Sequence, residues 1–205
     1  PPPPPPPNIL IIRRPPTSTP NPSPAAPDVY KRQVAPFGFE YINTGAHHTS
    51  GSSRCAEVME RVAADIVVNV QGDEPEVEPD HIDAVITAMT DPEVKCSTLA
   101  CPLAPGQQDN PNVVKVAMAC DGTAMYFSRS LIPYDRDNSG INRWRHVGLY
   151  AYRPDTLRQF CQWSHTPMEQ AEQLEQLRLL ENGIQIRVVT HQDPSPPGVD
   201  TLEQY

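Results

Sequence analysis

Proline most limits how this chain can fold, because half of its prolines stand together at one end. Of the 26 prolines, 13 lie within residues 1–27. Proline lacks a backbone N–H and fixes φ, so such a stretch is poorly suited to a helix or a central strand. It also offers little apolar surface to bury. We therefore expect residues 1–33 to be disordered or to make few contacts, and residues 34–205 to form one partial domain.

The end of this first segment has an unusual sequence. Residues 28–33 read DVYKRQ, which resembles one reading frame of a transposase end sequence used in sequencing adapters. A natural proline-rich linker is the alternative interpretation. We treat residues 1–33 as an unrelated or artefactual segment and leave them out of the reasoning about the fold.

Beyond residue 33, apolar runs typical of strands alternate with stretches of helical periodicity. The β-branched run Ile66–Val70 predicts a strand that is covered on both faces. Further strands are expected near residues 39–42, 96–101, 113–119, 146–152 and 184–189, and helices over residues 52–62, 79–89, 155–163 and 167–181. This alternation predicts an α/β fold with a mostly parallel sheet and helices on both faces.

Charge and cysteine content exclude some classes of protein. The net charge is −9, and residues 1–33 hold four basic residues and one acidic residue, so residues 34–205 carry −12. Such a surface does not suit nucleic acid, whose phosphates need Lys and Arg. No apolar run approaches about 18 residues, so no membrane span is expected. The cysteines show no CxxC spacing, which fits a reducing cytoplasm. They are Cys55, Cys96, Cys101, Cys120 and Cys161.

The strongest motif for chemistry is VNVQGDEP over residues 68–75. An apolar strand runs directly into Gln71, Gly72 and Asp73, and ligands of doubly wound sheets bind beyond the carboxyl ends of strands. A carboxylate there is a natural ligand for Mg²⁺, which takes carboxylates together with substrate phosphates. A polar turn in which Asp73 caps the next segment is the alternative.

A second motif, residues 44–57, contains the turn Ser50-Gly51-Ser52 at the expected start of a helix. Backbone N–H groups and hydroxyls at a helix start suit a nucleotide, although an ordinary capped helix start explains the residues equally well. The pair His47 and His48 raises the possibility of a metal site, but we find no Cys or acidic partner at a suitable spacing.

Three other segments carry polar groups near strand or helix ends. Arg129 and His146 lie in segments that contain further arginines, and Arg can grip a planar carboxylate with two hydrogen bonds. Glu175 and Gln176 could bind sugar hydroxyls, and the segment PGVDT presents Asp200 after a glycine turn. Surface ion pairs, a solvated helix face and a helix cap, respectively, are the alternatives.

Together these segments resemble the CMP-KDO synthetases (3-deoxy-manno-octulosonate cytidylyltransferases), in the same order and at similar spacing. The similarity runs from about residue 37 to residue 203 and includes VNVQGDEP, NPNVVKV, YFSRSLIPYDRD, RHVGLYAYR, LEQLR and GVDT. It implies a Rossmann-like nucleotidyltransferase fold with a mixed sheet. It also implies transfer of CMP from CTP to the anomeric hydroxyl of the acidic sugar KDO, with release of pyrophosphate, for lipopolysaccharide synthesis.

The resemblance also assigns roles, residue by residue. Asp73 and Asp200 are the implied Mg²⁺ ligands and catalytic residues, together with Arg129. The sugar is expected at Gln71, His146, Glu175 and Gln176, and the cytidine at Ser50, Gly51 and Ser52. The partners implied are CTP, KDO and a second copy of the chain, in contact through residues 113–134.

Some features depart from the family pattern. The family usually has Thr and an acid where this chain has Ser52 and Ser53. Residues 1–36 show neither the family's first strand nor its basic triphosphate-binding loop. We therefore expect the first strands to be missing and this copy to be inactive or nearly so. A non-catalytic sugar-binding or assembly fragment, and a cytidylyltransferase for another acidic sugar such as sialic acid, remain as alternatives.

Overall fold

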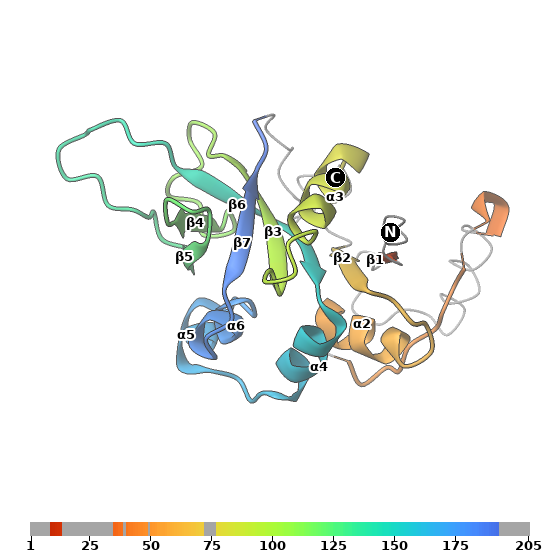
Figure 1. The fold of residues 1–205 in the computed structure, drawn as a ribbon. Helices are drawn as coiled ribbons and strands as arrows, with labels where there is room; N and C mark the ends of the chain where they lie inside the picture. Colours follow the sequence, from red (N-terminus) through yellow and green to blue (C-terminus); the bar gives the residue numbers. More distant parts are fainter. Residues whose placement is uncertain (1–8, 14–34, 39, 49, 72–76, 193–205) are drawn as a thin grey trace.

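The computed structural model describes residues 9–13, 35–38, 40–48, 50–71 and 77–192 (Figure 1). A seven-stranded sheet forms its centre, in the order β1-β2-β6-β3-β7, and β4 joins β6 and β5 at one side. The strands are β1 (Ile9–Arg13), β2 (Ile66–Val70), β3 (Cys96–Pro102), β4 (Lys115–Met118), β5 (Ala124–Ser128), β6 (Trp144–Tyr152) and β7 (Ile186–Thr190).

The expected mixed sheet is confirmed. Strand β1 pairs with β2 in parallel, and β3 pairs with β7 in parallel. Both β2 and β3 pair antiparallel with β6. Four of the five strands on the main path therefore share one direction, and β6 alone runs against them.

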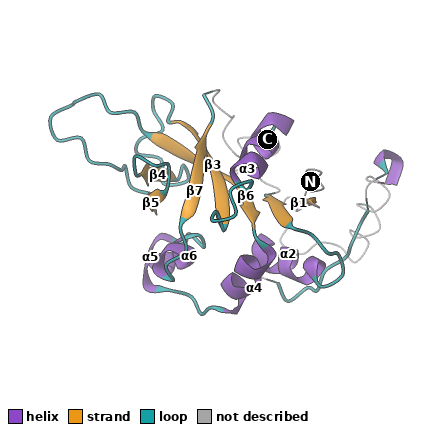
Figure 2. Cartoon of the chain, viewed as in Figure 1, coloured by secondary structure: helices purple, strands orange, loops and turns teal. Residues whose placement is uncertain are grey.

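Helices cover both faces of the sheet, as the alternating pattern predicts. The helices are η1 (Ala35–Phe37, a 3₁₀ turn), α2 (Gly51–Met59), α3 (Pro79–Ala88), α4 (Pro154–Gln162), α5 (Pro167–Glu172) and α6 (Leu177–Glu181). Helix α3 lies on one face, whereas α2, α4, α5 and α6 gather on the other (Figures 1 and 2). No helix in the described part of the chain is long and apolar enough to cross a membrane.

Strand β2 contributes side chains to two hydrophobic cores, one on each face of the sheet. All five of its residues are buried. Because successive side chains point to opposite faces, Ile66, Val68 and Val70 pack with α3, whereas Val67 packs in the cluster that contains Cys55 of α2. This is the doubly covered strand that the β-branched run predicted.

The expectation that residues 1–33 contribute no strand is wrong. Residues 9–13 form β1, which pairs with β2 over five positions, from Ile9 opposite Ile66 to Arg13 opposite Val70. The run ILIIR contains no proline, so it can extend even though prolines surround it. Strand β1 therefore covers one edge of β2.

Two further predictions about secondary structure are wrong, and one strand was missed. Residues 40–42 form no strand. Strand β5 was not predicted, although it forms a hairpin with β4 through a turn in which Gly122 has φ of 81°. The single helix expected over residues 167–181 is instead α5 and α6, interrupted at Gln173, which has a left-handed φ of 53°.

Candidate active site

The start of α2 has the predicted cap. Ser50 is the N-cap residue, and its side chain accepts a hydrogen bond of 3.2 Å from the Ser53 N–H. Gly51 is buried against β2, and a Cβ atom at this position would lie 3.3 Å from both polar atoms of the Asn69 amide. Glycine therefore lets the start of α2 lie directly on the end of β2, where the sequence places the ligand.

Ser52 and Glu175 meet although 123 positions separate them. The Ser52 hydroxyl, which is 1% exposed, donates a 2.8 Å hydrogen bond to Oε1 of Glu175. Burial raises the pKa of the Glu175 carboxyl, while the hydrogen bond from Ser52 opposes that shift. The contact joins the predicted nucleotide-binding turn to the predicted sugar-binding segment.

Glu175 lies in the break between α5 and α6, where it reaches Ser52. Arg129 stabilises this break. Its guanidinium donates to the carbonyls of Glu172 (2.7 Å), Gln173 (3.3 Å) and Pro111 (2.8 Å). The Glu172 carboxylate in turn accepts from the Arg129 N–H and the Ser128 hydroxyl. In this conformation Arg129 binds the end of α5, so a bond to a substrate carboxylate would require an exchange of partners.

Lys115 contacts Arg129 and was not predicted as a site residue from the sequence. It is fully buried in β4, and its ammonium donates to the carbonyls of Asn110 and Arg129, both at 2.8 Å. Burial lowers the pKa of this ammonium. A single lysine inside the apolar run VVKVA is the signal that could have identified it.

His146 lies on the same face of the sheet as Ser52. Its ring packs against Phe127 and Tyr150, with centroid distances of 5.0 and 5.3 Å. Burial, reinforced by the nearby Arg145 charge, lowers the pKa of His146 to about 3. The imidazole is therefore neutral at pH 7, and it cannot attract a carboxylate as a cation.

The tautomer of His146 follows from its neighbour. The only hydroxyl proton of Thr98 points to the Leu149 carbonyl at 2.8 Å. The hydroxyl oxygen must then accept the 3.0 Å hydrogen bond that joins it to Nε2 of His146. Nε2 thus carries the proton, and Nδ1 is left as an acceptor suited to a sugar hydroxyl.

Two other predicted sugar ligands lie at element ends. Gln71 follows β2 directly and is half-buried, and Gln176 is the buried N-cap of α6 beside Glu175. Asn69, which we did not predict as a site residue, is 1% exposed, and its Nδ2 has no hydrogen-bond partner among the described residues. An amide inside a β-branched run was its signal in the sequence.

The predicted metal ligands Asp73 and Asp200 both lie outside the described residues. Their convergence therefore remains a prediction.

A shallow cavity of about 310 Å³ lies elsewhere, between Pro102, Arg143, Trp144 and Gln192. It shares no residue with the candidate site, and its lining contains one cation and no carboxylate. It carries none of the groups that the predicted chemistry needs.

The fold is that of the nucleotidyltransferases. A solved structure of CMP:2-keto-3-deoxy-manno-octonic acid synthetase complexed with CTP superposes with a TM-score of 0.79 and 40% identity, over 87% of this chain and 73% of that one. A profile described as cytidylyltransferase matches residues 28–186, beginning within the segment that we had set aside. The chain belongs to the cytidylyltransferase family, and the resemblance to the CMP-KDO synthetases is confirmed.

Relatives of known name agree with this assignment. The 3-deoxy-manno-octulosonate cytidylyltransferase of Koribacter versatilis (strain Ellin345) is 49% identical over 146 residues, which is 71% of this chain and 56% of that protein. The protein of the same name from Acidobacterium capsulatum is 47% identical over 167 residues, 81% of this chain and 68% of that protein. The chain thus spans little more than half of the first relative and about two thirds of the second.

Proposed function

We propose that this chain belongs to an enzyme that transfers CMP from CTP to the anomeric hydroxyl of KDO, giving CMP-KDO and pyrophosphate. The contact between Ser52 and Glu175 carries the proposal. It joins the segment that the family pattern assigns to cytidine with the segment that it assigns to the sugar. Such a junction is what a reaction between a nucleotide and a sugar requires.

The described residues have distinct roles in this reaction. Glu175, Gln71 and Gln176 bind sugar hydroxyls, and neutral His146 accepts one through Nδ1. Ser50, Gly51 and Ser52 surround the cytidine. Arg129 shapes the sugar site through its bonds to the end of α5, and it reaches the KDO carboxylate after exchanging one carbonyl partner.

Asp73 and Asp200 would hold the Mg²⁺ ion, because carboxylates are the ligands that this cation prefers. When bound, the ion would neutralise charge on the CTP phosphates. Asp73→Asn should weaken CTP binding in the presence of Mg²⁺ more than in its absence. Equal loss under both conditions would argue against the metal assignment.

We further propose a cytoplasmic homodimer that binds neither nucleic acid nor membrane. The five cysteines of the chain form no disulfide, as expected in a reducing compartment. Met125 and Tyr134, within the expected dimer segment 113–134, are 66% and 87% exposed. Large exposed apolar side chains of this kind are typical of interfaces. Sedimentation of the chain and of Tyr134→Asp tests the dimer.

Titration calorimetry with KDO and with CTP tests the function. Glu175→Gln should weaken KDO binding by about tenfold or more, because a charge-assisted hydrogen bond to the sugar is lost. The control is Glu93→Gln, an exposed acid far along the chain from the site, which should bind as the unaltered protein does. KDO binding without pyrophosphate release would favour a non-catalytic sugar-binding fragment. Tighter binding of sialic acid than of KDO would favour the related sugar cytidylyltransferase.

A further inference from the structure

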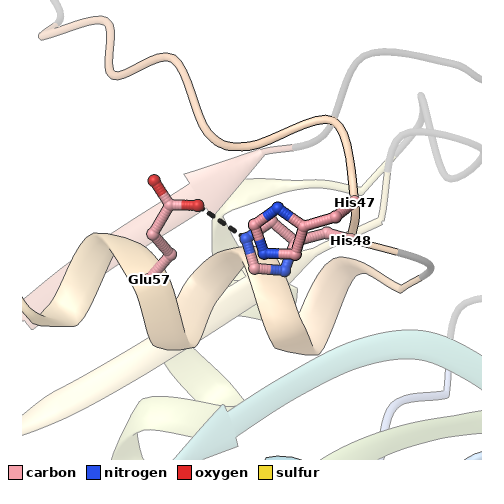
Figure 3. Close-up of side chains that lie close together, drawn as sticks. All are labelled: His47, His48 and Glu57. Atoms are coloured by element: carbon pink, nitrogen blue, oxygen red, sulfur yellow. Dashed lines mark hydrogen bonds and ion pairs between the residues drawn. The ribbon is translucent and has the colours of Figure 1, made fainter.

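Three metal-ligating side chains converge beside α2, and none of them is a predicted Mg²⁺ ligand. They are His47 and His48 of the preceding loop and Glu57 of the helix, and one ligand atom from each lies within 4.8 Å of the other two. Figure 3 shows Glu57 projecting from the helix toward the two neighbouring rings, whose planes are tilted by 36°. The acidic partner that we did not find by spacing is Glu57, which stands nine residues after His48.

We propose that His47, His48 and Glu57 form a binding site for a divalent transition-metal ion of the zinc type. Two imidazoles and one carboxylate are a typical donor set for Zn²⁺, whereas Mg²⁺ prefers oxygen ligands alone. The site is thus different in chemistry from the carboxylate pair proposed for Mg²⁺. It is independent of the proposed transferase activity.

The distances suit capture of an ion after small side-chain rotations. Ligand atoms around a tetrahedral zinc lie about 3.4 Å apart, since each bond is about 2.1 Å long. Nε2 of His48 and Oε2 of Glu57 are now 2.6 Å apart and would open slightly. The largest distance between any two ligand atoms of the three residues, at most 4.8 Å, would shorten. His47 is exposed, so an ion reaches the site from solvent.

The groups around the trio hold it in place. Arg54 of α2 donates to the Thr44 hydroxyl and to the carbonyls of Gly45 and His48, and so fastens the loop to the helix. The Gly45 N–H donates to the Glu57 carboxylate at 2.9 Å. This bond and the one to His48 lower the pKa of Glu57, so the carboxylate is charged and able to bind an ion. Fixed outer groups of this kind raise metal affinity.

Gly45 is needed for the position of His47. A Cβ atom at residue 45 would lie 2.4 Å from Cε1 and 2.5 Å from Nδ1 of the His47 ring. Any side chain there therefore forces the His47 ring to move from its present position. Gly45→Ala therefore disturbs the site without removing a ligand.

Titration of the full chain with ZnCl₂ tests the proposal, with calorimetry and ¹⁵N NMR of the imidazoles as readouts. All variants carry Cys120→Ser, because Cys120 is an exposed free thiol. We expect one ion per chain, with shifts of the His47 and His48 nitrogens. His47→Ala and Glu57→Gln should bind about tenfold more weakly or worse, and Gly45→Ala should also lose affinity.

The matched control is His165→Ala. His165 also pairs with a glutamate, at 2.8 Å from Glu169, but has no second histidine beside it. This variant should bind zinc as the parent does. His47 is exposed, so its replacement is not expected to disturb folding. The proposal is wrong if the chain binds no zinc or if His47→Ala binds with unchanged affinity. It is also wrong if the shifts are confined to His81 and His191, whose rings contact each other.

Discussion

The hydrophobic cores on the two faces of the sheet differ in amino-acid composition. The core under α3 is aliphatic, with Val68, Val85, Leu99 and Leu149 among its members and no aromatic ring. The core under α2, α4, α5 and α6 contains four aromatic rings, at Phe127, Tyr150, Tyr152 and Phe160. It also encloses the polar groups of the candidate site.

The difference shows where this fold accepts a cost in stability. Burying a polar group is unfavourable unless it is hydrogen-bonded. On the α3 face the apolar core is aliphatic, and the buried Ser97 hydroxyl donates a hydrogen bond to the Val85 carbonyl of α3. On the other face Asn69 is buried, and His146 and Glu175 are half-buried, a cost that a ligand bound by these groups would offset. The first face is therefore expected to respond to mutation through stability, and the second through both stability and binding.

The largest effect is expected at Arg178. This side chain binds the buried Glu169 carboxylate with two hydrogen bonds, and its guanidinium lies 4.6 Å from the Phe160 ring centroid. Burial alone would raise the pKa of Glu169, but the bonds from Arg178 and His165 lower it. Arg178→Ala leaves that charge unpaired and should cost about 3–5 kcal/mol of unfolding free energy, measured with urea.

A double variant sharpens this prediction. Arg178→Met with Glu169→Leu removes both charges at similar volume, so it should recover most of the lost stability. If the double variant is as unstable as Arg178→Ala, the ion pair is not the source of the loss, and packing against Phe160 is.

The next effect is expected on the α3 face. Met89 is 1% exposed in the aliphatic core. Met89→Ala should cost about 3 kcal/mol through lost burial and a residual cavity. At a temperature where the variant is folded, calorimetry should show unchanged KDO and CTP affinity. A clear loss of ligand affinity would break the proposed division between the two faces.

The sequence predicted elements fixed by local signals better than the rest of the fold, for a physical reason. Helices α2, α3 and α4 end within a residue or a few residues of the expected limits, because their apolar periodicity and caps act locally. Strand β2 follows its β-branched run in the same way. Local propensity and tertiary structure agree at these places.

The failures occur where distant contacts decide. Residues 167–181 have helical propensity throughout, yet Arg129 stabilises a break at Gln173 through bonds to Glu172 and Gln173, which lie 43 and 44 positions after it. No periodicity reveals such a bond. The Asp121-Gly122 pair, by contrast, is a local hairpin signal that would have predicted β5.

The candidate site was partly visible in the sequence. Ser52 and Glu175 were both predicted, and their contact is present. Glu172 was not, because nothing in its local sequence reveals its contact with Arg129. Lys115 was also missed, although a single lysine inside an apolar run is a usable signal. Glu57 was missed as a partner of His48 because the loop and the helix bring them together, and the spacing alone does not.

A pH effect is expected from His146. Its pKa is about 3 in the folded protein and about 6.5 unfolded, so below about pH 6.5 the unfolded chain binds the extra proton. The stability from this group is complete above that pH and decreases as the pH falls toward 3, by about 1.4 kcal/mol per pH unit at most. His146→Gln should show a flatter dependence between pH 6.5 and 4.5 in urea titrations. An unchanged slope would mean that the ring is solvated.

The smallest effect is expected at Ser50, where capping and ligand binding can be separated. Its side chain accepts the Ser53 N–H at the start of α2, so Ser50→Ala should cost about 1 kcal/mol of unfolding free energy. Glycine is a tolerated N-cap, and Ser50→Gly should cost only a few tenths of a kcal/mol. If the hydroxyl also binds cytidine, calorimetry should show CTP affinity reduced alike in both variants, although only Ser50→Ala is clearly less stable. If Ser50→Gly instead binds CTP as tightly as the parent, and only Ser50→Ala binds more weakly, then Ser50 serves only as a helix cap. The polar face would then bind its nucleotide through Gly51, Ser52 and their neighbours.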